Sequence, residues 1–236
     1  CRPEEAARSR AQPLCQSERA QQRETTPHQG HPTATPMKPL NSIHIIDQSH
    51  LLDPRDRTKF LPCACGPCSL VMAMNALGDE QELDEVLLFA LETGLFLPED
   101  PKCIYVAPQD LYRIAKQFKA GSELSTGQVG ADVSSVEARN TLEELLEGEC
   151  LVVVDLRCCL TQTRSTHFVV VYDMQKEEDG SFTVGIVDPL FSARTGEDGT
   201  LIWDVKAGGY RVPFELFDES WNSNPDGVDR WWLRLQ

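Results

Sequence analysis

The chain has 236 residues, of which 41% are hydrophobic and 25% charged, so it is long enough to bury a sizeable core as one or two domains. No apolar run approaches the roughly 20 residues that a membrane-spanning helix needs, so no membrane span is expected. The formal net charge is −15 at pH 7. Because so acidic a chain is repelled by phosphate backbones, we expect no nucleic-acid partner. A basic protein or peptide substrate is compatible with this charge.

Nine cysteines occur in the chain, at spacings that do not repeat. Their odd number and the lack of an apolar signal-peptide core favour reduced thiols in a cytoplasmic protein over a disulfide framework. Cys63, Cys65 and Cys68 are too crowded for a zinc knuckle, and no second CxxC pair follows. We therefore expect no metal and no other cofactor.

Residues 1–40 are rich in Arg, Glu, Gln, Ser, Thr and Pro, with almost no aliphatic side chains. Such a segment cannot bury enough apolar surface to offset its ordering entropy, which predicts a disordered N-terminal tail. Residues 41–236 are predicted to form one domain. That domain is expected to start with a short strand over 43–46, followed by a charged loop over 49–62.

A helix is predicted to follow, beginning at about Cys65 and ending before Gly78. Apolar residues recur at helical spacing through 70–77, Pro67 suits a first turn, and Gly78 suits a helix end. Cys65 then lies at the helix N-terminus, where unpaired N–H groups and the positive end of the dipole favour an anion. This position favours the thiolate, so Cys65 is predicted to be a nucleophile.

The rest of the chain changes from a helical to a strand pattern at Gly148. Apolar periodicity predicts helices over 83–95, 108–118 and 134–146, the last of them starting without a full capping box. Beyond Gly148, β-branched and aromatic runs bounded by turn residues predict strands. These strands cover 151–154, 167–172, 182–187, 201–203, 210–212 and 230–235, with a hairpin loop at 177–180 and a short helical turn over 213–217. Helices first and an antiparallel sheet afterwards predict an α+β domain.

A cysteine nucleophile needs a base within hydrogen-bonding reach and a group that orients this base. His167 is the one histidine downstream of Cys65, and it starts a predicted strand. The next strand ends at Asp188, so a hairpin between the two strands brings both residues to the same end. We predict that Asp188 accepts a hydrogen bond from His167, although an Asp-Pro pair also suits an ordinary turn.

Acyl transfer also needs a hydrogen-bond donor for the oxyanion that develops on the substrate carbonyl. Gln48, which follows the first predicted strand and precedes the cysteine, is the candidate for this donor. The backbone N–H of Cys65 is the expected second donor. The alternative interpretation of Gln48 is an ordinary loop residue.

Four segments together resemble the papain-like peptidases of the bacteriocin-processing, double-glycine leader type: Gln48, Cys65-Gly66-Pro67, His167-Phe168-Val169-Val170-Val171 and Val187-Asp188-Pro189. The resemblance covers residues 43 to about 232. It implies a papain-like α+β fold, in which an N-terminal helical part carrying the nucleophile packs on a C-terminal antiparallel β-sheet. It also implies hydrolysis of a peptide bond through a thioester intermediate. The implied catalytic residues are Cys65 as nucleophile, His167 as general base and acid, Asp188 as orienting residue and Gln48 as oxyanion donor.

Three alternatives remain open from the sequence. Cys65-Gly66-Pro67-Cys68 is also the redox motif of thioredoxins, which suggests a dithiol oxidoreductase using Cys65 and Cys68. An acyl or amide transferase would use the same triad with an amine in place of water. A silent papain-like module would bind peptides without cleaving them. A loop-like segment before Cys65, together with His167 and Asp188, favours the peptidase.

Overall fold

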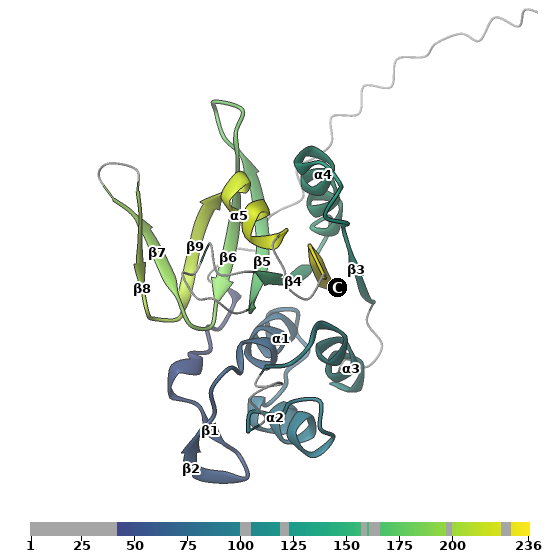
Figure 1. Ribbon diagram of the computed structural model, residues 1–236, viewed down its shortest axis with the longest axis vertical. Helices are drawn as coiled ribbons and strands as arrows, with labels where there is room; N and C mark the ends of the chain where they lie inside the picture. Colours follow the sequence, from purple (N-terminus) through teal and green to yellow (C-terminus); the bar gives the residue numbers. More distant parts are fainter. Residues whose placement is uncertain are drawn as a thin grey trace, which may run out of the picture. The chain divides into compact units, whose positions relative to one another are not determined.

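The computed structural model describes residues 42–99, 105–118, 123–156, 160, 166–196, 200–222 and 228–236, all of which lie in the unit Thr35–Gln236. The tail expected over 1–40 lies outside these residues. Within them, five α-helices and a six-stranded antiparallel sheet form a mixed α/β structure, compatible with the predicted α+β class (Figure 1). None of the helices in these ranges combines the length and apolar character of a membrane span.

The antiparallel sheet has the strand order β3-β10-β4-β5-β6-β9. Its central strands, β4 and β5, are buried along most of their length, which explains their continuous runs of valine. The β5–β6 hairpin turns at Gly180, whose φ of 87° suits glycine. The strands are β3 (Leu124–Gln128), β4 (Leu151–Leu156), β5 (His167–Lys176), β6 (Phe182–Asp188), β9 (Gly208–Pro213) and β10 (Trp231–Leu235).

The helices cover the two faces of the sheet in separate groups (Figure 1). One face packs against α1 (Cys65–Ala76) and α3 (Pro108–Phe118), and α2 (Leu83–Glu92) packs on these two helices within the same core. The other packs against α4 (Ser135–Leu145) and α5 (Phe214–Trp221). Every residue of α1 from Cys65 to Met74 is buried, which is why this helix is apolar on almost all sides. Helix α1 lies against β5 and β4, so the start of α1 and the start of β5 are held in one core.

The strand predicted over 43–46 is wrong. Ile43 is buried in the core around α1, but His44 and Ile45 are exposed, and the segment has no strand structure. The backbone N–H of Ile46 donates to the sulfur of Met72 on α1, at 3.3 Å. The apolar side chains that suggested a strand therefore pack this segment against the helix.

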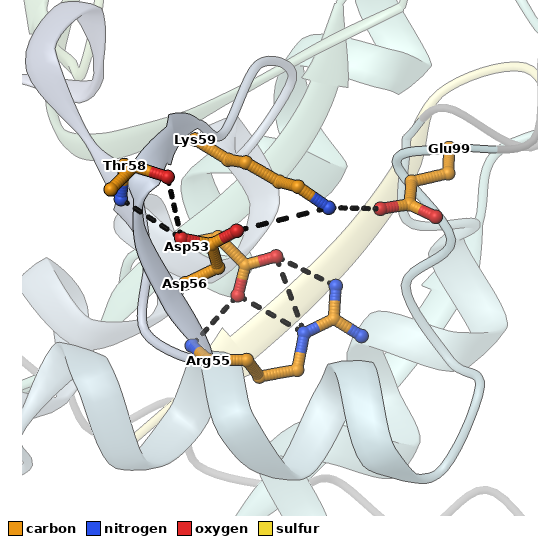
Figure 2. A network of polar contacts seen from close by, with 6 residues as sticks. All are labelled: Asp53, Arg55, Asp56, Thr58, Lys59 and Glu99. Atoms are coloured by element: carbon orange, nitrogen blue, oxygen red, sulfur yellow. Dashed lines mark hydrogen bonds and ion pairs between the residues drawn. The ribbon is translucent and has the colours of Figure 1, made fainter.

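The charged loop predicted over 49–62 is also wrong, because this region contains a short 3-10 helix, η2 (Gln48–His50), and a hairpin of β1 (Leu52–Asp53) and β2 (Asp56–Phe60). Figure 2 shows the polar contacts that close the hairpin. The Asp53 carboxylate accepts bonds from the Arg55 backbone N–H at 2.8 Å and its guanidinium Nη2 at 2.7 Å. Lys59 Nζ lies 3.5 Å from Glu99, which follows α2 (Figure 2). Strand β2 leads into the loop before Cys65, so these contacts stabilise the segment that precedes α1.

Three further features of the elements differ from the prediction. A full capping box opens α4, because Ser134 accepts from the Glu137 backbone and Glu137 accepts from the Ser134 N–H, contrary to the prediction. The short turn expected over 213–217 is the two-turn helix α5, whose aromatic side chains pack on the sheet. Besides β1 and β2, two further strands were not predicted. One is β3, which pairs along its length with β10, and the other is β7 (Ser192–Thr195), which forms a separate hairpin with β8 (Leu201–Asp204).

Candidate active site

The loop before α1 turns sharply and presents Cys65 as the first residue of the helix. Cys63 has a φ of 60°, in the left-handed region that residues other than glycine rarely adopt. Ala64 is the N-cap and supplies no side-chain hydrogen bond to the first turn. The helix end at Cys65 therefore keeps the N–H groups and positive dipole end that favour an anion. This is the helix start that the sequence predicts.

His167 and Asp188 form a buried hydrogen-bonded pair. The distance from His167 Nε2 to Asp188 Oδ1 is 2.7 Å, and the two residues are 4% and 0% exposed. Asp188 ends β6 and His167 begins β5, the next strand of the sheet. Since β5 and β6 run antiparallel, the start of one lies beside the end of the other. The hairpin thus brings together the two residues as the sequence analysis expects.

The side chain of Cys65 lies next to the imidazole of His167 and contributes to raising the pKa of the ring. Because Nε2 faces Asp188, the other ring nitrogen, Nδ1, is the one available to the thiol. Burial opposes the charged form of His167, but the charge and hydrogen bond of Asp188 and the interaction with Cys65 outweigh it and raise its pKa to about 10. At neutral pH the ring is therefore an imidazolium that can stabilise a neighbouring thiolate.

Gln48 reaches the same end of the sheet through its backbone. Its N–H donates to the carbonyl of Pro189 at 2.9 Å, directly after Asp188 in the chain. The side chain is 7% exposed, and its Oε1 has no hydrogen-bond partner among the residues that the structure describes. A buried amide oxygen without a donor is unusual, so this oxygen marks a place where a ligand group could donate a hydrogen bond.

The segment before Gln48 is anchored as well. Asp47 caps η2 by accepting from the Ser49 N–H at 2.9 Å. Burial opposes the ionisation of Asp47, yet the hydrogen bonds from Ser49 hold its pKa below the ordinary value. The negative charge of Asp47 also contributes to raising the pKa of the Cys68 thiol in the first turn of α1.

Cys68, the second cysteine of the CxxC motif, is fully buried in the core around α1. Burial, with smaller contributions from Cys65 and Asp47, raises the pKa of the Cys68 thiol well above its ordinary value. Burial likewise raises the pKa of Cys63. None of the four described cysteines, Cys63, Cys65, Cys68 and Cys150, forms a disulfide within the part of the chain that the structure describes. Among the described residues no group of three or more His, Cys, Asp or Glu side chains is arranged to hold a metal ion.

Two neighbours of the pair were missed by sequence reasoning. The Tyr210 hydroxyl on β9 donates to Asp188 Oδ2 at 2.9 Å, and the Phe191 ring packs edge-on against His167 at 5.7 Å between centroids. Tyr210 reaches Asp188 only because β9 pairs with β6, in a register that sets Tyr210 opposite Ile186. No local pattern signals that register. Phe191 lay three residues from a predicted site residue, which is the one clue the sequence offered.

The chain matches no known protein-family model, and no curated protein is significantly similar to it in sequence.

Proposed function

We propose that this protein is a cysteine peptidase with a papain-like fold, in which Cys65, His167 and Asp188 form a catalytic triad. The observation that carries the proposal is the position of His167, whose Nε2 lies 2.7 Å from Asp188 Oδ1 and whose ring lies next to the Cys65 side chain. A thiol at a helix start, a base in contact with it and a carboxylate that orients the base are what nucleophilic acyl transfer requires.

The reaction that follows from this arrangement has two stages. The Cys65 sulfur attacks the carbonyl carbon of a peptide bond, and His167 donates its proton to the departing amine as the C–N bond breaks. A water molecule then attacks the thioester carbonyl while His167 removes a proton from the water. The C–S bond breaks and releases the carboxylic acid and the Cys65 thiolate. Asp188 keeps the ring oriented through both stages.

Gln48 is proposed as the side-chain donor to the oxyanion, together with the Cys65 backbone N–H. Support comes from its backbone contact with Pro189 and from the contact of the preceding segment with α1 through Ile46 and Met72. Loss of one such donor typically lowers the rate about 10²–10³-fold. Gln48→Glu keeps the size of the side chain and removes the amide donor, so we expect it to lower kcat to that extent.

The papain-like fold is supported by the order of the parts. The nucleophile starts a buried helix, α1, that packs on β5 and β4 of the antiparallel sheet, and the base starts β5. The peptide partner and the cytoplasmic location expected from the sequence belong to this proposal. The free thiols at the site suit a compartment that keeps cysteines reduced.

The test is a set of single substitutions assayed on a library of fluorogenic peptides and by labelling with iodoacetamide. Cys65→Ala and His167→Ala are each expected to abolish hydrolysis, and Cys68→Ala to retain it. Peptide mapping should find Cys65 as the labelled residue in the unmodified protein, and the labelling rate should fall in His167→Ala.

Loss of activity in Cys68→Ala with no loss in His167→Ala would contradict the peptidase and support the dithiol oxidoreductase. An added amine that captures the acyl group in preference to water would identify a transferase.

A further inference from the structure

Asp188 is held by more donors than the proposed triad uses. Its Oδ1 accepts from His167 Nε2 and from the backbone N–H groups of Leu190 and Phe191, at 2.8 and 2.9 Å for the backbone donors. These bonds all converge on one oxygen. The backbone donors fix that oxygen from the turn that follows β6, so it points toward His167.

The other carboxylate oxygen depends on a residue that comes from a different strand. The Tyr210 hydroxyl donates to Asp188 Oδ2 at 2.9 Å. Among the described residues it is the one hydrogen-bond donor to this oxygen. Asp188 is 0% exposed and Tyr210 is 5% exposed, so bulk water does not compete for this contact. A hydrogen bond donated to a buried carboxylate favours the ionised form that the proposed mechanism needs.

The Tyr210 ring is itself held in place from outside the sheet. Trp203 on β8 packs edge-on against it, with 5.2 Å between ring centroids and an 80° angle between ring planes. The β7–β8 hairpin lies close against β9: a Cβ added at Gly208 would come within 2.7 Å of the Ser192 Cβ. The hydroxyl is therefore aimed at Asp188 by packing, and it needs no rearrangement to hold the carboxylate.

We propose that Tyr210 is a positioning residue of the active site, which fixes the Asp188 carboxylate so that His167 keeps its orientation toward Cys65; this inference rests on the proposed function. Tyr210 acts through Asp188 and touches neither the thiol nor the imidazole in this role. Removing its hydroxyl leaves Oδ2 buried without a donor, which disfavours the ionised carboxylate. An Asp188 carboxylate held less firmly stabilises the His167 imidazolium, and hence a neighbouring thiolate, less well.

The experiment measures the rate at which iodoacetamide alkylates Cys65, from pH 5 to pH 10 in roughly half-unit steps, by peptide mapping of the full chain. The variants are Tyr210→Phe, His167→Ala and, as a matched control, Tyr172→Phe, which removes a hydroxyl from another tyrosine of the same sheet. For Tyr210→Phe we expect an alkylation rate about threefold to tenfold lower at neutral pH. The acid limb, which is the part of the profile where the alkylation rate rises with pH, should move to higher pH. Tyr172→Phe should reproduce the unmodified profile.

The outcomes separate this inference from the proposed function. If His167→Ala changes the profile while Tyr210→Phe coincides with Tyr172→Phe, the role of Tyr210 is overturned and the triad stands. If His167→Ala leaves the profile unchanged, the triad and the role of Tyr210 both fail. Hydrolysis by Tyr210→Phe should show a lower kcat with little change in KM, because the hydroxyl does not face the substrate.

A double-mutant cycle tests whether the effect passes through Asp188. In an Asp188→Asn background, Tyr210→Phe should have almost no further effect on alkylation, and a full effect there would overturn the inference. The far-ultraviolet circular dichroism of each variant checks folding. Should Tyr210→Phe fail to fold, Trp203→Phe loosens the packing on the ring while keeping the hydroxyl. It should shift the acid limb in the same direction by a smaller amount, and an unshifted limb would count against the role of Tyr210.

Discussion

Ser69 on α1 donates a hydrogen bond to the backbone carbonyl of Phe168 on β5, at 2.9 Å and fully out of contact with solvent. Ser69 lies one helical turn after Cys65, and Phe168 directly follows His167. This single bond therefore joins the element that carries the sulfur to the element that carries the imidazole. Gly66 allows the same close approach, because a Cβ at that position would lie 3.3 Å from the Phe168 ring.

Ser69→Ala is expected to lower both the stability of the protein and the reactivity of Cys65. Loss of the hydrogen bond should lower the free energy of unfolding by about 0.5–1.5 kcal/mol, measured by urea denaturation. The looser seating of α1 on β5 should also lower the alkylation rate of Cys65. Ser125→Ala, at an exposed serine of β3, is the control and should change neither quantity. A stable, fully reactive Ser69→Ala variant would show that the bond does not set the distance between the two groups.

The stability of the fold should depend on pH through His167. Burial opposes its charge, but Asp188 and Cys65 raise its pKa to about 10, above the roughly 6.5 of an unfolded chain. The native state therefore keeps a proton that the unfolded state releases. The resulting stabilisation is fully present below about pH 6.5 and is lost as the pH rises through about 10.

Urea titrations at intervals between pH 6 and pH 10 measure this effect against His167→Gln, which keeps a polar side chain and does not titrate. The unmodified protein should lose stability relative to the variant as the pH rises through this window. Two curves that stay parallel would mean that His167 is not held as an imidazolium. Hydrolysis should likewise decline as the pH rises through about 10, because the leaving amine then lacks its acid.

Arg230 and Asp218 form a buried ion pair whose loss should be severe. Arg230 Nε lies 2.7 Å from Asp218 Oδ1, both residues are nearly inaccessible, and Nη1 also donates to the carbonyls of Gly130 and Val133. Asp218→Ala leaves this guanidinium buried without its counter-charge, so we expect a loss of about 3–5 kcal/mol in unfolding free energy. Glu99→Ala breaks only the exposed pair with Lys59 and should cost less than about 1 kcal/mol. Comparable losses in the two variants would contradict this account.

The capping box of α4 gives a further prediction from a single side chain. Ser134→Ala removes the oxygen that accepts from the Glu137 N–H, and we expect a loss of about 1 kcal/mol in thermal or urea unfolding. Ser135→Ala, one residue later and inside the helix, should be nearly neutral. Equal effects of the two substitutions would show that the helix start lies elsewhere.

Local features of the sequence were sufficient for several elements. Helix α3 spans Pro108–Phe118 as predicted, because proline at the first turn and one apolar face are local signals. The end of α1 was also predictable, since Gly78 adopts a φ of 90° just past it. The β1–β2 hairpin was missed because its charged residues carry no alternating apolar pattern and its strands are short. The strand predicted over 43–46 was wrong because the apolar pattern there was strand-like for another cause. These side chains pack on a helix, and the segment pairs with no strand among the described residues.

By itself, the sequence determined where a helix starts with a cysteine, where a strand starts with the downstream histidine, and where the next strand ends with an aspartate. Each of these depends on interactions between neighbours in the chain. The approach of the His167 ring to both Cys65 and Asp188, and the bond from Tyr210 to that carboxylate, depend instead on the packing of distant elements. Hydrogen bonds reach only about 3 Å, so they depend on how α1 seats on β5 and on the register of β6 with β9. Packing between distant residues sets both, and no local pattern specifies it.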